Sequence, residues 1–528
     1  MNNNNIKLND IWEFSFNDGP KTSVTVPNCF DTLKEYQFKR GIGTYSQTVE
    51  ASGQVELFYE ALGLRAKIYW DENLIWEEKT PYTPNKIKFD AGSLQLHTLK
   101  IVCDNTIDDS CESEFRSFYD FYGFGGIFHN ITLRKLPTTA FDYVKVIPNI
   151  ENKSIDLQVK LFGPYEEVKV YIDDVFVGLL PETLTANIKV PNGKLWSPET
   201  PNLHKLTLIS NLDTYTCNFG LRKIEAKDGK IYLNNQEIKL VGVNRHEVHP
   251  SCGAATSKEI ILQDLKMIKA AGFNMIRGAH YPQCEDLLNA ADSLGILIWN
   301  EIIGWGPTIE SLINQEFQRR QYDSLTRMIT TSINHPSIIM WGFLNEGATD
   351  KIEARPCVSL LYNTAKALDD SRLITYASMY GEKDLCLDLV DVVNFNTYPG
   401  WYGGTHTFFE PNLVIPKLNE LLNFVKSNPS IANKPVIISE IGAAAFIGDH
   451  SKRRWSEEYQ ASLIECAINY TLNNPDYSGI LLWQFCNSPV DDNIRIMMRP
   501  RGYNNKGLVD EYRREKLAWK LFPNILAK

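Results

Sequence analysis

The sequence predicts two β-sandwich domains followed by a (β/α)8 TIM barrel. Across residues 1–225, short apolar or alternating runs are separated by turn residues, and convincing helical patterns are lacking. After residue 226, stretches with helical spacing alternate with compact β-branched runs, which is the pattern of repeated βα units. With 528 residues, the chain is also longer than one hydrophobic core usually organises.

The first half of the chain divides into two sets of strands. In both sets, apolar residues occupy alternate positions or form short continuous runs. Examples are residues 54–60, 66–70 and 98–102 in the first set, and 154–161 and 168–172 in the second. This pattern is typical of antiparallel sandwiches. We therefore expect one sandwich domain over residues 1–138 and a second over residues 139–225.

Eight compact apolar runs in the second half are candidate parallel strands. They are residues 238–243, 273–276, 296–299, 338–343, 373–377, 390–394, 436–439 and 479–483. Amphipathic stretches such as 259–271 and 456–467 lie between them. Eight strands in roughly 300 residues fit a TIM barrel, whose usual length is about 250 residues. We assign residues 226–528 to this barrel, and polar residues just after its strands become candidates for the functional site.

Composition narrows the possible partners and compartments. The net charge of −10 contains no run of five or six like charges, so we expect no nucleic-acid or anionic-membrane partner. The start of the chain lacks the apolar core of a secretory signal, and no apolar span of about 20 residues occurs, so we expect a cytoplasmic protein. Ten dispersed cysteines without a Cys-x-x-Cys pair indicate buried free thiols rather than disulfides or a zinc site.

Two glutamates follow predicted barrel strands. Glu346 comes after the fourth strand and Glu440 after the seventh, and each is followed closely by glycine. Residues at the carboxyl ends of barrel strands gather at one mouth, so the two carboxylates can face each other. A single such glutamate more often caps a helix or pairs with a cation. Two together favour glycoside hydrolysis, in which one carboxyl protonates the leaving oxygen and the other attacks the sugar.

The sequences around both glutamates resemble glycoside hydrolase family 2. Trp341-Gly-Phe-Leu-Asn-Glu346 is similar to its acid/base motif, and Val436-Ile-Ile-Ser-Glu440-Ile-Gly is similar to its nucleophile motif. Three other segments resemble further signatures of the family, namely residues 195–203, 242–247 and 274–283. The resemblance implies a jelly-roll sugar-binding domain, an immunoglobulin-like sandwich and a catalytic barrel, with a retaining mechanism, Glu346 as acid/base and Glu440 as nucleophile.

The resemblance also implies residues that support the two glutamates. Arg277 should donate to Glu440 and keep it ionised, because a nearby cation favours the charged form. Tyr398 should hydrogen-bond the same carboxylate. Glu346 must instead hold a proton at neutral pH, so its pKa should be raised.

Further residues are expected to contact the sugar. Asn345 should bond its 2-hydroxyl, Trp483 should form an apolar floor and His280 should contact substrate. An ordinary core position for Trp483 is nearly as common. His246-Glu-Val-His249 lacks the His-x-x-x-His spacing of a helical metal site, so we expect no metal and no cofactor.

A basic loop after the eighth strand suggests an acidic sugar. Asn504 and Lys506 in Arg499-Pro-Arg-Gly-Tyr-Asn-Asn-Lys506-Gly resemble the Asn-x-Lys motif with which β-glucuronidases hold the sugar carboxylate. Arg501 is expected to contribute. Asp120 and Tyr402 fit a jelly-roll aspartate and an active-site tyrosine of these enzymes.

The expected partner is therefore a small-molecule or oligosaccharide β-glycoside, most similar to the substrates of bacterial β-glucuronidases, and the enzyme should be exo-acting. Pro500 occupies the position of an arginine in glucuronidases, and Arg245-His-Glu-Val-His-Pro is closer to the galactosidase form. A β-galacturonidase is thus the main alternative, followed by a β-galactosidase. An inactive glycan-binding relative is the alternative outside enzymes. We also expect a homo-oligomer.

Overall fold

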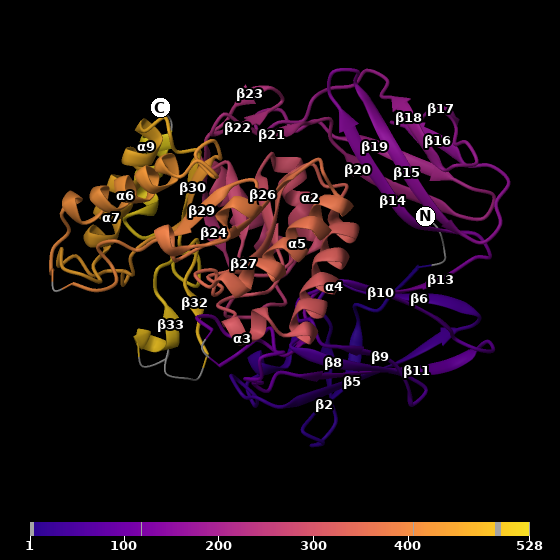
Figure 1. Cartoon of the computed structure of the whole chain (residues 1–528). Helices are drawn as coiled ribbons and strands as arrows, with labels where there is room; N and C mark the ends of the chain where they lie inside the picture. The colour runs from indigo at the N-terminus through magenta and orange to yellow at the C-terminus, as the bar shows by residue number, and fades with distance from the viewer. Residues whose placement is uncertain (1–4, 118, 405, 492–497, 527–528) are drawn as a thin grey trace.

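The computed structural model describes residues 5–117, 119–404, 406–491 and 498–526. The chain forms two all-β regions and a barrel surrounded by helices (Figure 1). In that view the indigo N-terminal strands lie below the barrel, and the strands of the second β region lie at its upper right.

The N-terminal region is a sandwich of antiparallel sheets. Its larger sheet has the order β3-β2-β5-β11-β8-β9, and the facing sheets have the orders β1-β13-β6-β10 and β4-β12-β7. Alternate residues of the long strands point into a shared core that includes Trp12, Tyr45 and Leu99. The strands are β1 (Asn5–Lys7), β2 (Ile11–Phe16), β3 (Thr22–Thr25), β4 (Asn28–Cys29), β5 (Ile42–Ala51), β6 (Gln54–Tyr59), β7 (Leu62–Gly63), β8 (Arg65–Trp70), β9 (Asn73–Glu78), β10 (Asn85–Asp90), β11 (Gln95–Asp104), β12 (Gly126–Ile127) and β13 (Ile131–Lys135). The one helical segment described here is the short η1 (Phe30–Thr32).

The second β region is a smaller two-sheet sandwich. One sheet has the order β14-β15-β18 and the other β17-β16-β19-β20, all antiparallel. Its strands are β14 (Ala140–Asn149), β15 (Ser154–Phe162), β16 (Lys169–Ile172), β17 (Val175–Leu179), β18 (Thr185–Lys189), β19 (His204–Ile209) and β20 (Thr214–Phe219). Residues such as Ile155, Val170 and Leu206 fill the space between the sheets. Seven strands in this arrangement fit an immunoglobulin-like sandwich.

The barrel contains eight parallel strands in the order β28-β27-β26-β25-β24-β31-β30-β29. A parallel bridge between Ser378 and Phe395 joins the two ends of this order. The strands are β24 (Leu240–Arg245), β25 (Met275–Gly278), β26 (Leu297–Glu301), β27 (Ile338–Asn345), β28 (Leu373–Ala377), β29 (Val393–Asn396), β30 (Val436–Ile441) and β31 (Gly479–Leu482). All eight expected strands are present, which confirms the predicted fold class. Several end two residues later than predicted.

Small elements cover the amino-terminal end of the barrel. The sheet of β21 (Ile224–Lys227), β22 (Lys230–Leu233) and β23 (Gln236–Glu237) places Ile231 and Leu233 in one buried cluster with residues from the barrel strands, such as Leu240 and Met275. This end of the barrel is therefore closed, which leaves the carboxyl ends of the strands as the accessible mouth.

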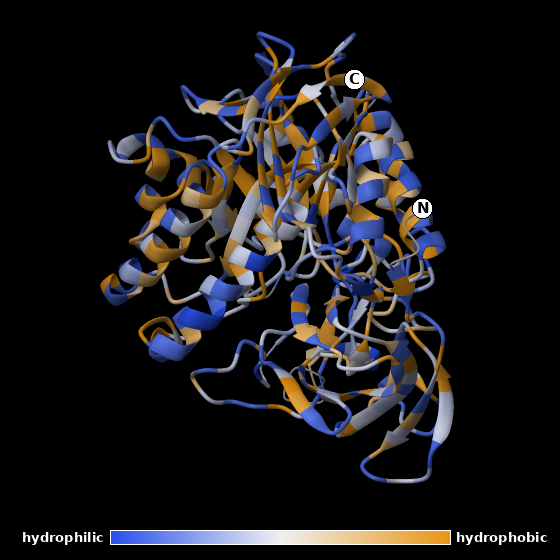
Figure 2. Ribbon diagram, turned by 90° about the vertical axis from the view of Figure 1, so that its right-hand side faces the viewer, coloured by the Kyte–Doolittle hydropathy of each residue, from blue (hydrophilic) through white to orange (hydrophobic). Residues whose placement is uncertain are grey.

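Helices surround the barrel. They are α1 (Lys258–Ala270), α2 (Glu285–Leu294), α3 (Ile309–Leu312), α4 (Gln315–Ser332), α5 (Arg355–Leu368), α6 (Ile415–Ser427), α7 (Glu457–Asn473) and α9 (Phe522–Leu526), with short helical turns η2 (Ile352–Ala354), η3 (Gly381–Lys383), η4 (Leu387–Leu389), η5 (Pro411–Leu413), η6 (Pro500–Gly502) and η7 (Trp519–Leu521). Ser257 and Ser456 cap α1 and α7 by accepting backbone hydrogen bonds. Hydrophobic residues concentrate on the central strands (Figure 2). Within the described ranges, no helix has the length and apolar character needed to cross a membrane.

Two short strands shape the loop after the barrel's last strand. β32 (Ser488–Pro489) pairs with β33 (Tyr503–Asn504) in an antiparallel arrangement. This pairing holds the basic segment around residues 499–507 beside the mouth of the barrel. The ten cysteines are all free, and most are buried, as predicted.

Candidate active site

A cavity of about 460 Å³ lies at the carboxyl ends of the barrel strands. Most of the residues predicted from the sequence come together there. Those that line the cavity are Asp120, Glu346, Tyr398, Tyr402, Glu440, Trp483 and Lys506. With Arg499, which also lines it, the cavity thus combines two carboxyl groups from the barrel, one from the N-terminal sandwich, and two cations from the loop after the eighth strand.

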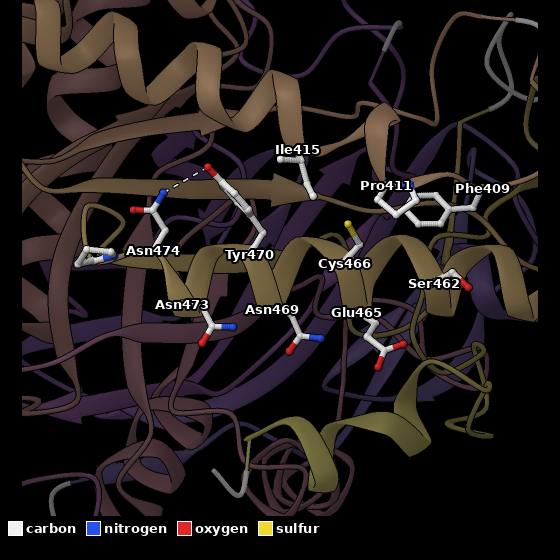
Figure 3. Close-up of a pocket in the computed structure, with 11 residues that line it drawn as sticks. Phe409, Pro411, Ile415, Ser462, Glu465, Cys466, Asn469, Tyr470, Asn473 and Asn474 are labelled. Carbon is white, nitrogen blue, oxygen red and sulfur yellow. Dashed lines mark hydrogen bonds between the residues drawn. The ribbon is translucent and has the colours of Figure 1, made fainter.

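A larger hollow of about 890 Å³ lies elsewhere, on the outer surface between η5 and α7 (Figure 3). Its described lining includes aromatic and amide side chains such as Phe409, Tyr470 and Asn473. Glu465 is the single carboxylate among these lining residues, and no Lys, Arg or His occurs among them. The hollow therefore lacks the paired carboxyl groups that glycoside hydrolysis needs.

Glu346 stands immediately after β27. Its backbone N–H donates to the carbonyl oxygen of Ala377 at 2.9 Å, so the neighbouring strand fixes its position. Its φ of 55° lies in the left-handed region, which is uncommon for residues with a Cβ and is typical of constrained functional positions. Asn396, at the end of β29, donates to Glu346 Oε1 at 3.0 Å and to Asn345 Oδ1 at 2.9 Å.

Glu440 lies within β30 and is held by two donors. Arg277 Nη1 donates to its Oε1 at 2.9 Å, and the Tyr398 hydroxyl donates to its Oε2. The same guanidinium also forms an ion pair with Glu301 and donates to Asn345 Oδ1 at 2.8 Å. Arg277 is fully buried, so its position is set by these acidic and amide partners.

Burial dominates the charge state of Glu440. Desolvation raises the pKa of Glu440 to about 8, and the charge of Glu346 also raises it, whereas Arg277 and Tyr398 lower it. Burial therefore outweighs the guanidinium, which had been expected to keep Glu440 ionised. Two coupled carboxyl groups titrate as a pair. The raised pKa of Glu440 accordingly favours retention of one proton by the Glu346–Glu440 pair.

His280 and Trp483 form a layered wall beside the pair. Their rings stack with centroids 5.1 Å apart and an interplanar angle of 17°. His280 Nδ1 lies 2.8 Å from Glu301 Oε1, and burial together with the charge of Arg277 lowers the pKa of His280 well below its ordinary value. Trp483 is 4% exposed, so it serves both the core and the cavity wall. His280 lies against its ring.

Two buried polar atoms near the carboxyl pair have no hydrogen-bond partner among the described residues. They are Asn345 Nδ2 and His280 Nε2. In the neutral His280, Nδ1–H donates to Glu301, so Nε2 is an acceptor, whereas Asn345 Nδ2 is a donor. Unpaired buried polar atoms are unfavourable, so a ligand that satisfies both gains free energy when it binds. The hydroxyl groups of a sugar are suitable partners.

The opposite end of the cavity is cationic. Lys506 Nζ donates to the Tyr402 hydroxyl oxygen at 2.6 Å, and Arg499 Nη2 donates to the same oxygen at 2.9 Å. Arg499 also forms an ion pair with Asp120, which accepts from Asn504 Nδ2 at 3.0 Å. Lys506 and Arg499 are 1% and 5% exposed, so both charges are shielded from solvent.

Arg501 occupies a different place from the one expected. It does not line the cavity, and it instead pairs with Glu511 at 2.9 Å and donates to Asn505 Oδ1 at 3.1 Å. Arg499 lines the cavity in its stead. Asn504 also lies behind the lining, where its amide contacts Asp120.

One cluster outside the cavity has side chains of the metal-ligating types. Atoms of His129, Glu247 and Cys284 lie within 4.8 Å of one another. However, the Glu247 oxygens already accept from His129 Nε2 at 3.1 Å and from Thr256 Oγ1 at 2.8 Å. An ion pair between the N-terminal sandwich and the barrel therefore accounts for this cluster.

Comparison with known proteins gives the family. A model described as "Glycosyl hydrolases family 2, TIM barrel domain" matches residues 224–492, and a second, "Glycosyl hydrolases family 2", matches residues 139–222. The chain belongs to glycosyl hydrolase family 2. It is therefore a glycoside hydrolase, as the sequence predicted.

Relatives of this family 2 chain extend over its whole length. A β-glucuronidase of Streptococcus agalactiae is 26% identical and aligns with 98% of this chain and 95% of its own. The crystal structure of a GH2 β-galacturonidase from Eisenbergiella tayi bound to galacturonate superposes with a TM-score of 0.92 and 30% identity, covering 99% of this chain and 97% of that one. A Faecalibacterium prausnitzii β-glucuronidase shares the fold with a TM-score of 0.90 at 23% identity.

Sequence reasoning missed two polar groups of this family 2 site. Asn396 and Glu301 each end a barrel strand, so their positions in the strands were a usable signal. Asn396 contacts Glu346, and Glu301 orients Arg277. The choice between Arg499 and Arg501 had no such signal, because both flank Pro500 in the same loop.

Proposed function

We propose that this glycoside hydrolase is an exo-acting β-glucuronidase that removes terminal β-D-glucuronic acid with retention of configuration. The observation that carries the proposal is the convergence of Lys506 and Arg499 on Tyr402 in the cavity that holds Glu346 and Glu440. In a chain with a net charge of −10, Lys506 and the Arg499–Asp120 ion pair leave one net positive charge at this end of the cavity, which favours a substrate with its own negative charge.

In the proposed reaction, Glu440 attacks the anomeric carbon while Glu346 protonates the departing glycosidic oxygen. The carbon–oxygen bond to the leaving group breaks as the bond to the Glu440 oxygen forms, which gives a covalent glycosyl-enzyme. Glu346, now ionised, takes a proton from water, and that water displaces Glu440 from the same carbon. Two inversions restore the β configuration and return the proton to Glu346.

Other side chains have supporting roles in this proposal. Arg277 and Tyr398 orient the Glu440 carboxylate by occupying both of its oxygens. Asn345 offers its unpaired amide to a sugar hydroxyl. Lys506 and Arg499 supply charge to the C6 carboxylate of the sugar, for which charge-assisted hydrogen bonds are the strongest kind available.

The proposed domain division is 1–138, 139–225 and 226–528. It places Asp120 in the jelly-roll domain and the other cavity residues in the barrel. The ion pair between Asp120 and Arg499 then joins the first domain to the proposed carboxylate subsite. The substrate subsite would thus be assembled from two domains.

A β-galacturonidase is the second candidate. The similarity to the Eisenbergiella tayi β-galacturonidase at 30% identity over nearly the whole chain favours it. Glucuronate and galacturonate differ in the configuration at C4 alone, so the same cations serve both. Turnover of aryl β-glucuronide, β-galacturonide and β-galactoside compared side by side tests both candidates. Preference for the neutral galactoside would refute a uronidase of either kind.

A further inference from the structure

The two cations of the cavity need a rigid support. Lys506 and Arg499 both contact the Tyr402 hydroxyl, so two like charges are held next to each other. Asp120 pairs with Arg499 and offsets part of the repulsion, but the ammonium of Lys506 has no such carboxylate partner among the contacts given above, and the flexible stem of a lysine favours moving the ammonium out to water. The backbone that carries Lys506 must therefore be fixed by contacts elsewhere.

Lys516 supplies such contacts on both sides of Lys506. Its ammonium donates to the backbone oxygen of Asn505 at 2.9 Å and to Asn487 Oδ1 at 3.0 Å. The same Asn487 oxygen accepts the backbone N–H of Gly507 at 3.1 Å. Lys516 thus binds the residue before Lys506 directly and the residue after it through one amide.

The same backbone is joined to the loop that follows Glu440. The N–H of Ala445 donates to the Asn505 carbonyl oxygen at 3.1 Å. This oxygen therefore receives one bond from the segment after β30 and one from Lys516. The carbonyl oxygen of Lys506 itself accepts the backbone N–H of Gln484 at 3.2 Å, so Lys516 adds to a support that holds Lys506 in place relative to Glu440.

The hydrogen-bonding capacity of Lys516 suits these contacts in either protonation state. Its side chain is fully buried, and burial lowers the pKa of Lys516 to about 7. A neutral amine still has two N–H groups, which match the two oxygens that Lys516 contacts. Burying an amine is unfavourable unless it is hydrogen-bonded, so its presence here indicates that these two bonds matter.

We propose that Lys516 is a positioning residue for uronide selectivity, which holds the backbone on both sides of Lys506 and so keeps the Lys506 ammonium at the cationic end of the cavity. This inference rests on the proposed uronidase function. Lys516 touches neither the cavity nor the carboxyl pair, so its loss should affect recognition of the sugar carboxylate more than the chemistry at the anomeric carbon.

The test compares kcat/KM for an aryl β-uronide with kcat/KM for the matched neutral aryl glycoside. We expect Lys516→Met to lower the value for the uronide by about 10- to 100-fold, mainly through KM, because small misplacements of binding groups have effects of this size. The neutral glycoside should change less than about threefold. Lys516→Gln, which retains amide donors, should fall between wild type and Lys516→Met. If Lys516→Met does not fold, the uronide-to-neutral activity ratio of Lys516→Gln tests the proposal in its place.

Lys239 provides a matched control. Lys239 is only partly buried, whereas Lys516 is fully buried, but burial lowers the pKa of Lys239 as well, and its ammonium donates to the backbone oxygens of Thr471, Leu472 and Asn474. Lys239 precedes β24, at the amino-terminal end of the barrel. Lys239→Met should lower stability and leave the ratio of uronide to neutral activity unchanged.

Three outcomes would contradict the proposal in distinguishable ways. Equal losses on both substrates in Lys516→Met would make Lys516 a general structural residue. Uronide preference lost in Lys506→Ala but kept in Lys516→Met and Lys516→Gln would overturn the inference alone. A wild type without uronide preference would overturn the proposed function, and this inference with it.

Discussion

Replacing Lys506 by alanine tests the proposed carboxylate subsite most directly. A unit charge about 3 Å from a carboxylate, at an effective dielectric constant of about 20, contributes roughly 5 kcal/mol of attraction. Truncating one member of a buried charge pair costs about 2–5 kcal/mol in measured cases. Lys506 is 1% exposed, so solvent screens it little, but Arg499 remains beside the site.

The remaining guanidinium places the expected loss in the lower part of this range. A loss of about 2–3 kcal/mol corresponds to a fall of about 30- to 150-fold in kcat/KM for the uronide. Steady-state kinetics with an aryl uronide and its neutral counterpart measure the effect, and the neutral substrate should be nearly unaffected. Equal losses on both would show that Lys506 maintains the loop. No loss on either would mean that the carboxylate is held elsewhere, with Arg499 the next residue to examine.

The remaining predictions concern the carboxyl pair and the two arginines. Glu346→Gln should retain more activity on a nitrophenyl glycoside than on an alkyl one, because an activated leaving group needs little protonation, whereas Glu440→Gln should lose both; equal losses for Glu346→Gln would refute its acid role. For the wild type with an alkyl glycoside, kcat/KM should fall above about pH 8, because the Glu346–Glu440 pair then loses its proton. This fall at high pH should disappear for Glu346→Gln with the nitrophenyl substrate. If the fall persists, another group is responsible for it. Proton NMR of the first-formed sugar should show the β anomer, and an α product would remove the nucleophile role from Glu440. Finally, Arg499→Ala should reduce kcat/KM for the uronide by an order of magnitude or more, which is the effect of losing one charge-assisted hydrogen bond. Arg501→Ala should change this kcat/KM little. A larger loss for Arg501→Ala than for Arg499→Ala would contradict the placement of both side chains.

The barrel and its carboxyl pair could be predicted because each depends on a local pattern. A buried parallel strand is a short run of apolar residues, and Glu346 and Glu440 end such runs at the barrel mouth. Strand ends were less accurate because the last residues, such as Arg245 and Glu301, are polar although they lie inside the protein. Their burial is compensated by partners from distant parts of the chain.

The cationic end of the cavity could be predicted only in part. Arg499 and Arg501 are separated by one proline, and nothing local distinguishes them. Their placement depends on Asp120, which pairs with Arg499, and on Glu511, which pairs with Arg501. Both acidic partners come from other segments, so the outcome is a property of tertiary structure. The raised pKa of Glu440 could not be predicted either, because the extent of burial that raises this pKa is not visible in the sequence.

The family 2 models match residues 139–222 and 224–492, yet Asp120, Arg499 and Lys506 all lie outside these stretches. The glutamates proposed to break the bond and the charged groups at the proposed carboxylate subsite are thus carried by different stretches of one chain. Two members could keep the same barrel core and diverge in the short segments before and after it. Exchanging residues 498–507 between relatives is therefore a compact way to transfer a preference for one sugar while leaving the bond-breaking apparatus in place.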